Sequence, residues 1–178
     1  MTKAIFFWRE SDEAGWLCQW FHHPFRDDED PERVYFTAEH FMMYQKAKLF
    51  GDDATAAEVL RTKAPRKAKS LGRKVTNFKE AVWEAKCEAI VLKGNMLKFG
   101  APASGQTPIQ PGSEGSLRDK LLRTGDAELV EASPFDRVWG VGFKPEEAEA
   151  NRKRWGLNLL GKALMEVRAA LREEEEKK

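Results

Sequence analysis

The sequence predicts a mainly α-helical fold with a few short β-strands, of the α+β class, in a single domain. Several segments space their apolar residues at helical intervals between capping residues and glycines, a few short apolar runs are typical of strands, and no internal repeat occurs. The length of 178 residues suits one domain with its own core. We therefore expect one compact domain over residues 1–178, with a core at about 5–168 and a charged helix end at 169–178.

Polar residues or a proline precede the longer predicted helices, where they can accept backbone N–H groups or open the first turn. The expected pairs are Thr37 with AEHFMMYQKAKLF, Asp52 or Asp53 with DATAAEVLRT, Pro65 with PRKAKSLG, Asn77 with FKEAVWEAKCEAIVLKGNMLKF, and Asn158 with LLGKALMEVRAALREEEEKK. Shorter helices are expected at LRDKLLRTG and after Pro145.

The predicted strands are short and lie far apart along the chain. They cover KAIFFWRE and residues 33–36, 128–132 and 138–143. Residues 100–116 are rich in glycine, proline and serine, which predicts a long surface loop after the longest helix.

Composition excludes several classes of protein. The 30 basic and 29 acidic residues leave a net charge of +1, which argues against indiscriminate coating of nucleic acid but allows a local basic face. No apolar run reaches the roughly 18–20 residues of a membrane span, and we expect no secretory signal. Cys18 and Cys87 lack a CxxC spacing, so we expect reduced thiols in a cytoplasmic protein, or in a nuclear one if the source is a eukaryote.

Motifs for common cofactors and nucleophiles do not occur. The sequence contains no GxGxxG, Walker A, GxSxG or HExxH pattern. His22 and His23 have no third ligand nearby in the sequence. We therefore expect no metal and no cofactor, and we expect a monomer.

One face of the first predicted helix combines an acid, an amine and apolar groups. Glu39, Met43, Lys46 and Phe50 follow one another at helical spacing. At about 1.5 Å per residue, Glu39 and Lys46 lie roughly 10 Å apart along the axis, so both side chains could reach one sugar-sized ligand. The alternative is a surface acid–amine pair on an amphipathic helix.

A second cluster lies in SPFDRVWGVGF, residues 133–143. Trp139 and Gly140 would provide a ring platform beside a close backbone approach, with Asp136 just before them. The alternative is a strand in the core with Asp136 capping a turn.

A third cluster lies in RWGLNLLGKALM, residues 154–165. Gly156 and Asn158 precede a helix N-terminus, where free backbone N–H groups favour an anion such as phosphate, and Arg152 and Arg154 flank it. The alternative is an ordinary capped helix.

The segment RTKAPRKAKSLGRK is a concentrated basic strip without an acid. Its members are Arg61, Lys63, Arg66, Lys67, Lys69, Arg73 and Lys74. Such a strip can follow a phosphate backbone, and the alternative is a solvated face balanced by acidic residues elsewhere.

Taken in order, several segments resemble the NADAR superfamily, also called YbiA-like. They are FFW with GWLCQWF, FTAEHFMMYQKA, AVWEAKCEAIVLKGNMLKF, SPFDRVWGVGF and WGLNLLGKALMEVR, and they span residues 5–168. The most specific pieces are the EHFMMYQKA helix, the D-x-x-WG turn and the closing WGxNxLGxxLMxVR. The resemblance implies a compact, mainly helical N-glycosidase fold.

The resemblance also implies an active site, with Glu39, Lys46 and Asp136 as catalytic residues. The residues expected to contact the substrate are Trp8, Arg9, Gln19, Trp20, His40, Trp83, Trp139, Gly140, Gly156 and Asn158. Taken alone, Trp83 could equally be a core residue of the long helix. At Cys18, Gln19 and Trp20 the chain departs from the S-N-F of most bacterial members.

Two activities belong to such proteins: hydrolysis of ribosylaminopyrimidine intermediates of riboflavin biosynthesis, and removal of ADP-ribose from guanine in nucleic acid. Both substrates have an amine on the anomeric carbon, which Lys46 could attack as a nucleophile while Glu39 moves protons. The alternative is direct attack by water. The basic strip favours DNA or RNA as the substrate and ADP-ribose as the product; a non-catalytic ADP-ribose-binding module and a plain interaction domain are the alternatives of another class.

Overall fold

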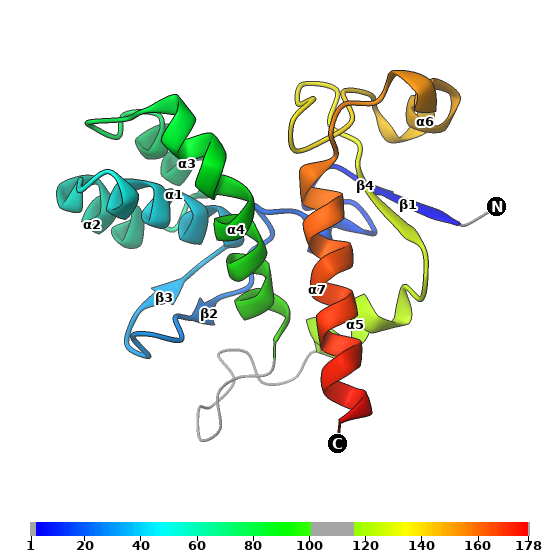
Figure 1. Ribbon diagram of the computed structural model, residues 1–178, viewed down its shortest axis with the longest axis horizontal. Helices are drawn as coiled ribbons and strands as arrows, with labels where there is room; N and C mark the ends of the chain where they lie inside the picture. The colour runs from blue at the N-terminus through cyan, green and yellow to red at the C-terminus, as the bar shows by residue number, and fades with distance from the viewer. Residues whose placement is uncertain (1–2, 101–115, 178) are drawn as a thin grey trace. The chain divides into compact units, whose positions relative to one another are not determined.

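The computed structural model describes residues 3–100 and 116–177 (Figure 1). The described chain is mainly helical with short strands, which confirms the predicted fold class. It forms two compact units, which we call unit 1 (Met1–Phe21 and Glu114–Lys178) and unit 2 (His22–Ser113). The predicted loop at 100–116 falls almost entirely outside the described residues, and a single domain over the whole chain stays a prediction.

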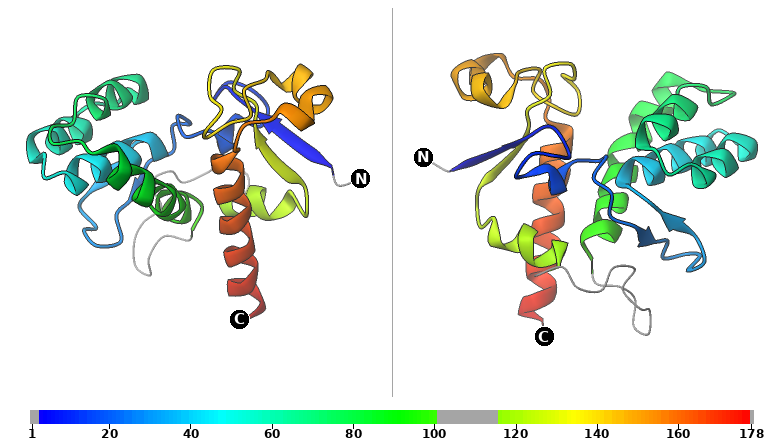
Figure 2. Two further views of the ribbon diagram at one scale, coloured as in Figure 1. Left: turned by 45° about the horizontal axis from the view of Figure 1, so that its top comes forward. Right: turned by 180° about the vertical axis from the view of Figure 1, so that it is seen from behind.

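Unit 2 is a group of four helices with a small hairpin. The helices are α1 (Ala38–Leu49), α2 (Asp53–Arg61), α3 (Pro65–Gly72) and α4 (Glu80–Phe99). Helix α1 packs against each of the other three, and strands β2 (Phe25–Arg26) and β3 (Val34–Tyr35) pair in antiparallel fashion beside it (Figures 1 and 2). Strand β2 was not predicted.

The starts of three helices follow the predicted caps. The Thr37 side chain accepts the His40 N–H, the Asp52 side chain accepts the Thr55 N–H, and Pro65 opens α3. These contacts satisfy N–H groups that have no partner within the helix.

The prediction that Asn77 caps α4 is wrong. Asn77 has a φ of +57° and Lys79 occupies the N-cap position, without a side-chain cap. Asparagine tolerates the left-handed region better than most residues, so Asn77 turns the chain before the helix instead of capping it.

Unit 1 is built on a two-stranded parallel sheet and a long helix. Strands β1 (Ala4–Phe7) and β4 (Glu128–Glu131) pair in register, although they come from opposite ends of the sequence. Helix α7 (Leu159–Glu176) packs against β4 and against α5 (Leu117–Arg123), and its apolar residues Leu160, Leu164, Val167 and Leu171 are buried. The remaining elements are the 3-10 helices η1 (Gly15–Leu17) and η2 (Glu149–Arg154) and the short helix α6 (Pro145–Ala148).

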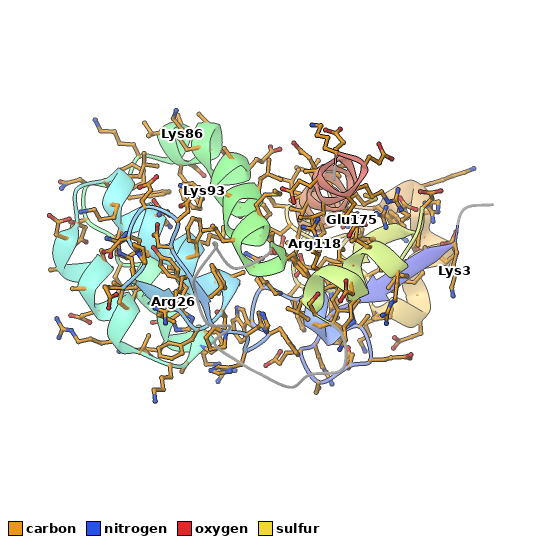
Figure 3. The ribbon with its side chains drawn as sticks, turned by 90° about the horizontal axis from the view of Figure 1, so that it is seen from below. Lys3, Arg26, Lys86, Lys93, Arg118 and Glu175 are labelled. Carbon is orange, nitrogen blue, oxygen red and sulfur yellow. The ribbon has the colours of Figure 1, made fainter. Side chains whose placement is uncertain are left out.

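The C-terminal end of α7 is held by charge. Arg118 of α5 lies 2.9 Å from Glu174 and 3.7 Å from Glu175 (Figure 3). The predicted charged end at 169–178 is therefore a continuation of α7, as far as Glu176.

The predicted strand at residues 138–143 does not form. The N–H groups of Val138 and Trp139 donate to the Asp136 carboxylate, and Gly142 has a φ of +78°. The segment is therefore a turn-rich loop. Its carbonyl groups accept hydrogen bonds from the N–H groups of residues 156–160, as described below. None of the described helices is both long enough and apolar enough to cross a membrane.

Candidate functional site

Helix α1 places Glu39 and Lys46 on the face that was predicted. Glu39, in the first turn, is buried, and Lys46, in the last turn, is half buried. Between them Met43 touches the end of α3, where a Cβ on Gly72 would occupy the position of the Met43 Sδ atom. The C-terminal end of α3 therefore lies against the same face as the acid and the amine.

Two aromatic rings flank the Lys46 amine. Its Nζ lies 4.5 Å from the ring centroid of Phe78 and 5.2 Å from that of Trp83. The Phe78 ring also meets Phe50 edge to face, with centroids 5.2 Å apart. Rings at these distances attract the charged amine, but they also remove water from it.

The Lys46 pKa is lowered from its usual value near 10.5, and burial is the largest cause. The charge of Arg73 lowers the pKa further, and the charge of Glu39 opposes both effects. A lysine with a lowered pKa holds more of the neutral, nucleophilic amine near neutral pH. Unit 2 thus brings together an acid, an amine with a lowered pKa and aromatic rings.

His40 belongs to the core of unit 2 and not to this face. The residue is 1% exposed, and its ring has Nδ1 at 2.8 Å from Thr37 Oγ1 and Nε2 at 3.0 Å from the Thr62 carbonyl. Burial lowers the His40 pKa to about 4, opposed by the Thr62 hydrogen bond. Both ring nitrogens are engaged within the protein, which leaves neither for the substrate contact that was predicted.

The basic strip lies on the outside of unit 2. Six of its members are exposed, and the seventh, Lys69, is half buried. Within the part of the chain that the structure describes, none of these six forms an ion pair with a carboxylate; they are Arg61, Lys63, Arg66, Lys67, Arg73 and Lys74. The strip reaches the α1 face at Arg73, whose charge acts on Lys46.

In unit 1, Trp8 and Arg9 lie together after β1. The Arg9 guanidinium stacks over the Trp8 ring at 4.3 Å, and the 87% exposed Phe135 lies 6.2 Å from that ring. Gln19 and Trp20, also predicted to contact the substrate, are half buried in the segment after η1.

Asp136 shapes the turn that precedes Trp139. Its Oδ1 accepts the N–H groups of Val138 at 2.9 Å and Trp139 at 2.8 Å, as in the alternative prediction of a turn-capping residue. Gly140 follows, buried against the Glu131 carbonyl. The structure therefore brings Asp136, Trp139 and Gly140 together in one turn.

The backbone N–H groups on which the predicted phosphate site before α7 depended already have partners within the protein. The N–H groups of residues 156–160 donate to carbonyl groups of residues 137–141. Gly156 lies so close to the Arg137 carbonyl that a side chain would collide with it. Asn158 has a φ of +51° and its side chain bonds Leu129 and Glu131 instead of capping α7. These amides are not free for an anion.

The two arginines predicted beside that phosphate site are also engaged. Arg152 forms ion pairs with Glu128 at 2.7 Å and Glu149 at 2.9 Å, and Arg154 donates to Asn151. Among residues 3–100 and 116–177, no three histidine, cysteine or carboxylate side chains are grouped to hold a metal ion.

Sequence reasoning missed Phe78. The chain has eleven phenylalanines, and nothing in its spacing distinguishes this one. The one hint in the sequence that Phe78 belongs to the site was its position two residues before α4, the helix that contains Trp83. The predicted site residues thus fall into a unit 2 set and a unit 1 set, and the prediction that both sets act on one substrate stays a prediction.

Comparison with known proteins identifies the family. The model of the NADAR domain matches residues 6–172, and the chain therefore belongs to the NADAR domain family. The fold is similar to the NMR structure of the Escherichia coli protein YbiA, with a TM-score of 0.72 and 28% identity, over 99% of this chain and 89% of that one.

Two curated relatives bear on activity. N-glycosidase R617 of Acanthamoeba polyphaga mimivirus is 38% identical over 93% of this chain and 95% of its own length. The riboflavin biosynthesis protein PYRR of Zea mays is 29% identical over 96% of this chain but only 25% of its own length. The chain is thus a homologue of N-glycosidases.

Proposed function

We propose that this protein is an N-glycosidase that removes ADP-ribose from the amino group of guanine in DNA or RNA. The single observation that supports it best is the Lys46 amine, held between Phe78 and Trp83 with a lowered pKa, on the same face as a buried glutamate. An N-glycosidase acting on a ribosylamine needs a nucleophile and a proton carrier of this kind.

The chemistry begins with opening of the ribose ring. A proton from Glu39 reaches the ring oxygen while the nitrogen lone pair of the guanine amine forms a C=N bond to the anomeric carbon. The neutral Lys46 amine adds to that carbon, and the added Lys46 nitrogen passes a proton to the guanine nitrogen. The C–N bond to guanine then breaks as Lys46 forms a C=N bond, the imine, to the same carbon. Water then hydrolyses the Lys46 imine, and this step releases ADP-ribose and restores the amine.

A competing route has no covalent step. Glu39 would deprotonate a water molecule that attacks the anomeric carbon and would pass that proton to the guanine nitrogen as the C–N bond to guanine breaks. Borohydride added during turnover reduces the imine of the first route to a stable adduct on Lys46. No adduct, together with full activity of Lys46→Ala, would exclude the covalent route.

The choice of substrate rests on the basic strip. A free metabolite makes no use of six exposed cations that lack carboxylate partners, whereas a phosphate backbone does. The strip also reaches the α1 face at Arg73. A modified guanine can thus be held while its strand lies along α3.

The riboflavin alternative has its own support, because PYRR of Zea mays is a relative. The deciding experiment incubates the protein with an ADP-ribosylated guanine oligonucleotide and, separately, with a ribosylaminopyrimidine, followed by mass spectrometry. Release of free ADP-ribose supports the proposal, and turnover of the ribosylaminopyrimidine alone overturns it.

A non-catalytic ADP-ribose-binding module is the remaining alternative. Glu39→Gln distinguishes it, because an enzyme loses turnover in this variant while a binding module shows turnover in neither form. Calorimetry with ADP-ribose then separates a binding module, which releases heat, from a plain interaction domain, which does not.

A further inference from the structure

Arg73 differs from the other members of the basic strip because it lies beside the α1 face. It occupies the C-cap of α3 directly after Gly72, where a Cβ would collide with the Met43 Sδ atom. Met43 stands between Glu39 and Lys46 on that face. The close approach that a glycine permits therefore brings Arg73 to the acid and the amine.

Contacts on both sides fix the backbone of Arg73. Its N–H donates to the Lys69 carbonyl at 3.1 Å, which closes the last turn of α3. Three residues further on, the Thr76 N–H donates to Asp52 Oδ2 at 2.9 Å, and Val75 between them is buried. The Arg73 side chain therefore extends from a fixed point next to α1, which reduces the entropy that is lost when it binds a ligand.

The Arg73 guanidinium is available to an anion. Arg73 is exposed, and within residues 3–100 and 116–177 it forms no ion pair with a carboxylate. Its charge nevertheless lies near enough to Lys46 to lower the pKa of that amine. An anion bound at Arg73 would gain a charge-assisted contact and would also offset the repulsion between the two basic groups.

We propose that Arg73 binds the phosphate carried by the ribose whose anomeric carbon Lys46 attacks, and that it is a specificity-determining residue of the site. In ADP-ribose the diphosphate is attached to the 5′-oxygen of that same ribose, so it lies across one sugar ring from the reacting carbon. The N–H groups of a guanidinium can donate two parallel hydrogen bonds to such a phosphate. The role in turnover rests on the proposed function, while phosphate binding by Arg73 does not.

The first test compares guanosine carrying ribose 5-phosphate on its amino group with guanosine carrying unphosphorylated ribose there. Arg73→Gln should lower the preference for the phosphorylated substrate, measured as the ratio of the two kcat/KM values, about tenfold. Loss of the Arg73 charge also raises the Lys46 pKa, but this acts on both substrates and leaves the ratio unchanged. Arg73→Lys keeps the charge without the planar group and should retain part of the preference. The matched control, Lys86→Gln, removes an exposed charge from α4 and should leave the ratio unchanged.

The second test needs no enzymatic activity. Acetic anhydride acetylates the neutral form of an amine, so the midpoint of the Lys46 acetylation rate across pH, followed by mass spectrometry of the free protein, reports the Lys46 pKa. Inorganic pyrophosphate bound at Arg73 adds negative charge near the amine and should move this midpoint to higher pH. Arg73→Gln should move it in the same direction without pyrophosphate, because a positive neighbour is removed, and pyrophosphate should then have no further effect.

The outcomes of the two tests separate this inference from the proposed function. An unchanged substrate preference in Arg73→Gln overturns the assignment of Arg73. A pyrophosphate effect that is missing in the unmodified protein, or that persists in Arg73→Gln, overturns it as well. If the unmodified protein acts on neither ribosylated guanosine, the proposed function fails, and the acetylation midpoint still decides whether Arg73 binds phosphate.

Discussion

Helices α1 and α7 both begin after a polar residue, yet the two helix starts use their polar groups in opposite ways. At α1, Thr37 caps its own helix, and Glu39 and Lys46 further along lie on one face of that helix. At α7, Asn158 turns its side chain to β4, and the amides around it bond a neighbouring loop. A distinctive sequence pattern therefore marks the proposed site in the first case and a structural contact in the second.

The largest expected effect tests the functional side of this comparison. Lys46→Ala and Glu39→Gln should each lower kcat by about a thousandfold, since each removes a group that takes part in covalent or proton-transfer steps. Release of ADP-ribose under saturating substrate is the measurement. Asp136→Asn keeps an oxygen to accept the Val138 and Trp139 N–H groups, so it isolates the charge of Asp136 from its turn. Activity within tenfold of normal in Lys46→Ala would remove the amine from the mechanism.

The next effect tests the architectural side. Asn158→Ala leaves the Leu129 carbonyl and the Glu131 N–H without their partner, which should cost about 3 kcal/mol and lower Tm by roughly 6–12 °C. Asn158→Gly removes backbone strain but not this loss, so its Tm should also fall. The matched control is the exposed Asn77, also left-handed, where replacement by glycine should change Tm by no more than a degree or two. Equal shifts at the two positions would contradict the assignment.

A third effect concerns His40, the buried histidine of α1 that contacts the end of α2. The folded-state pKa of His40 is about 4, below the value near 6.5 expected in the unfolded chain, so the unfolded chain binds more protons between these values. The free energy of unfolding should therefore be constant above pH 6.5 and fall by about 3 kcal/mol as the pH approaches 4. Urea unfolding at pH 7.5, 5.5 and 4.5 measures this slope.

His40→Gln is the control for that slope. It should flatten the pH dependence, leaving a smaller remainder from His23, whose pKa is also lowered by burial. A slope as steep as that of the unmodified protein would assign the pH dependence to other groups.

The smallest effect tests the basic strip. Arg66→Glu combined with Lys67→Glu should raise KM for an ADP-ribosylated oligonucleotide about tenfold at low salt, with little change for the modified nucleoside. Lys120→Glu with Arg123→Glu reverses two exposed charges on α5 and should affect neither substrate. Equal losses on oligonucleotide and nucleoside would remove the strip from substrate recognition.

Local signals predicted the helices of unit 2 well. The caps Thr37 and Asp52 and the helix-opening Pro65 involve residues within one turn, so the sequence contains all that is needed. The pairing of β1 with β4 joins residues more than a hundred positions apart, and no local pattern specifies such a partner. The strand wrongly predicted at 138–143 also reflects contacts with a segment further along the chain, because backbone carbonyl groups there accept hydrogen bonds from residues 156–160.

For the site, the sequence predicted which face of α1 is special but not what surrounds it. Helical periodicity alone puts Glu39, Met43 and Lys46 on one face. The position of Phe78 could not be predicted. It follows from the hydrogen bond that the Thr76 N–H donates to the Asp52 carboxylate and from the positive φ of Asn77. His40 was wrongly expected to contact the substrate. Its burial against the end of α2 depends on how the two helices pack, and the local sequence does not show this.

The contact between Met43 and Gly72 has an evolutionary consequence. Because the thioether fills the place that a side chain at 72 would need, each position limits the size of the other. A larger residue at 72 fits only if the Met43 side chain turns away or is replaced by a shorter one, so we expect substitutions at 72 to be accompanied by changes at 43 among descendants of this protein.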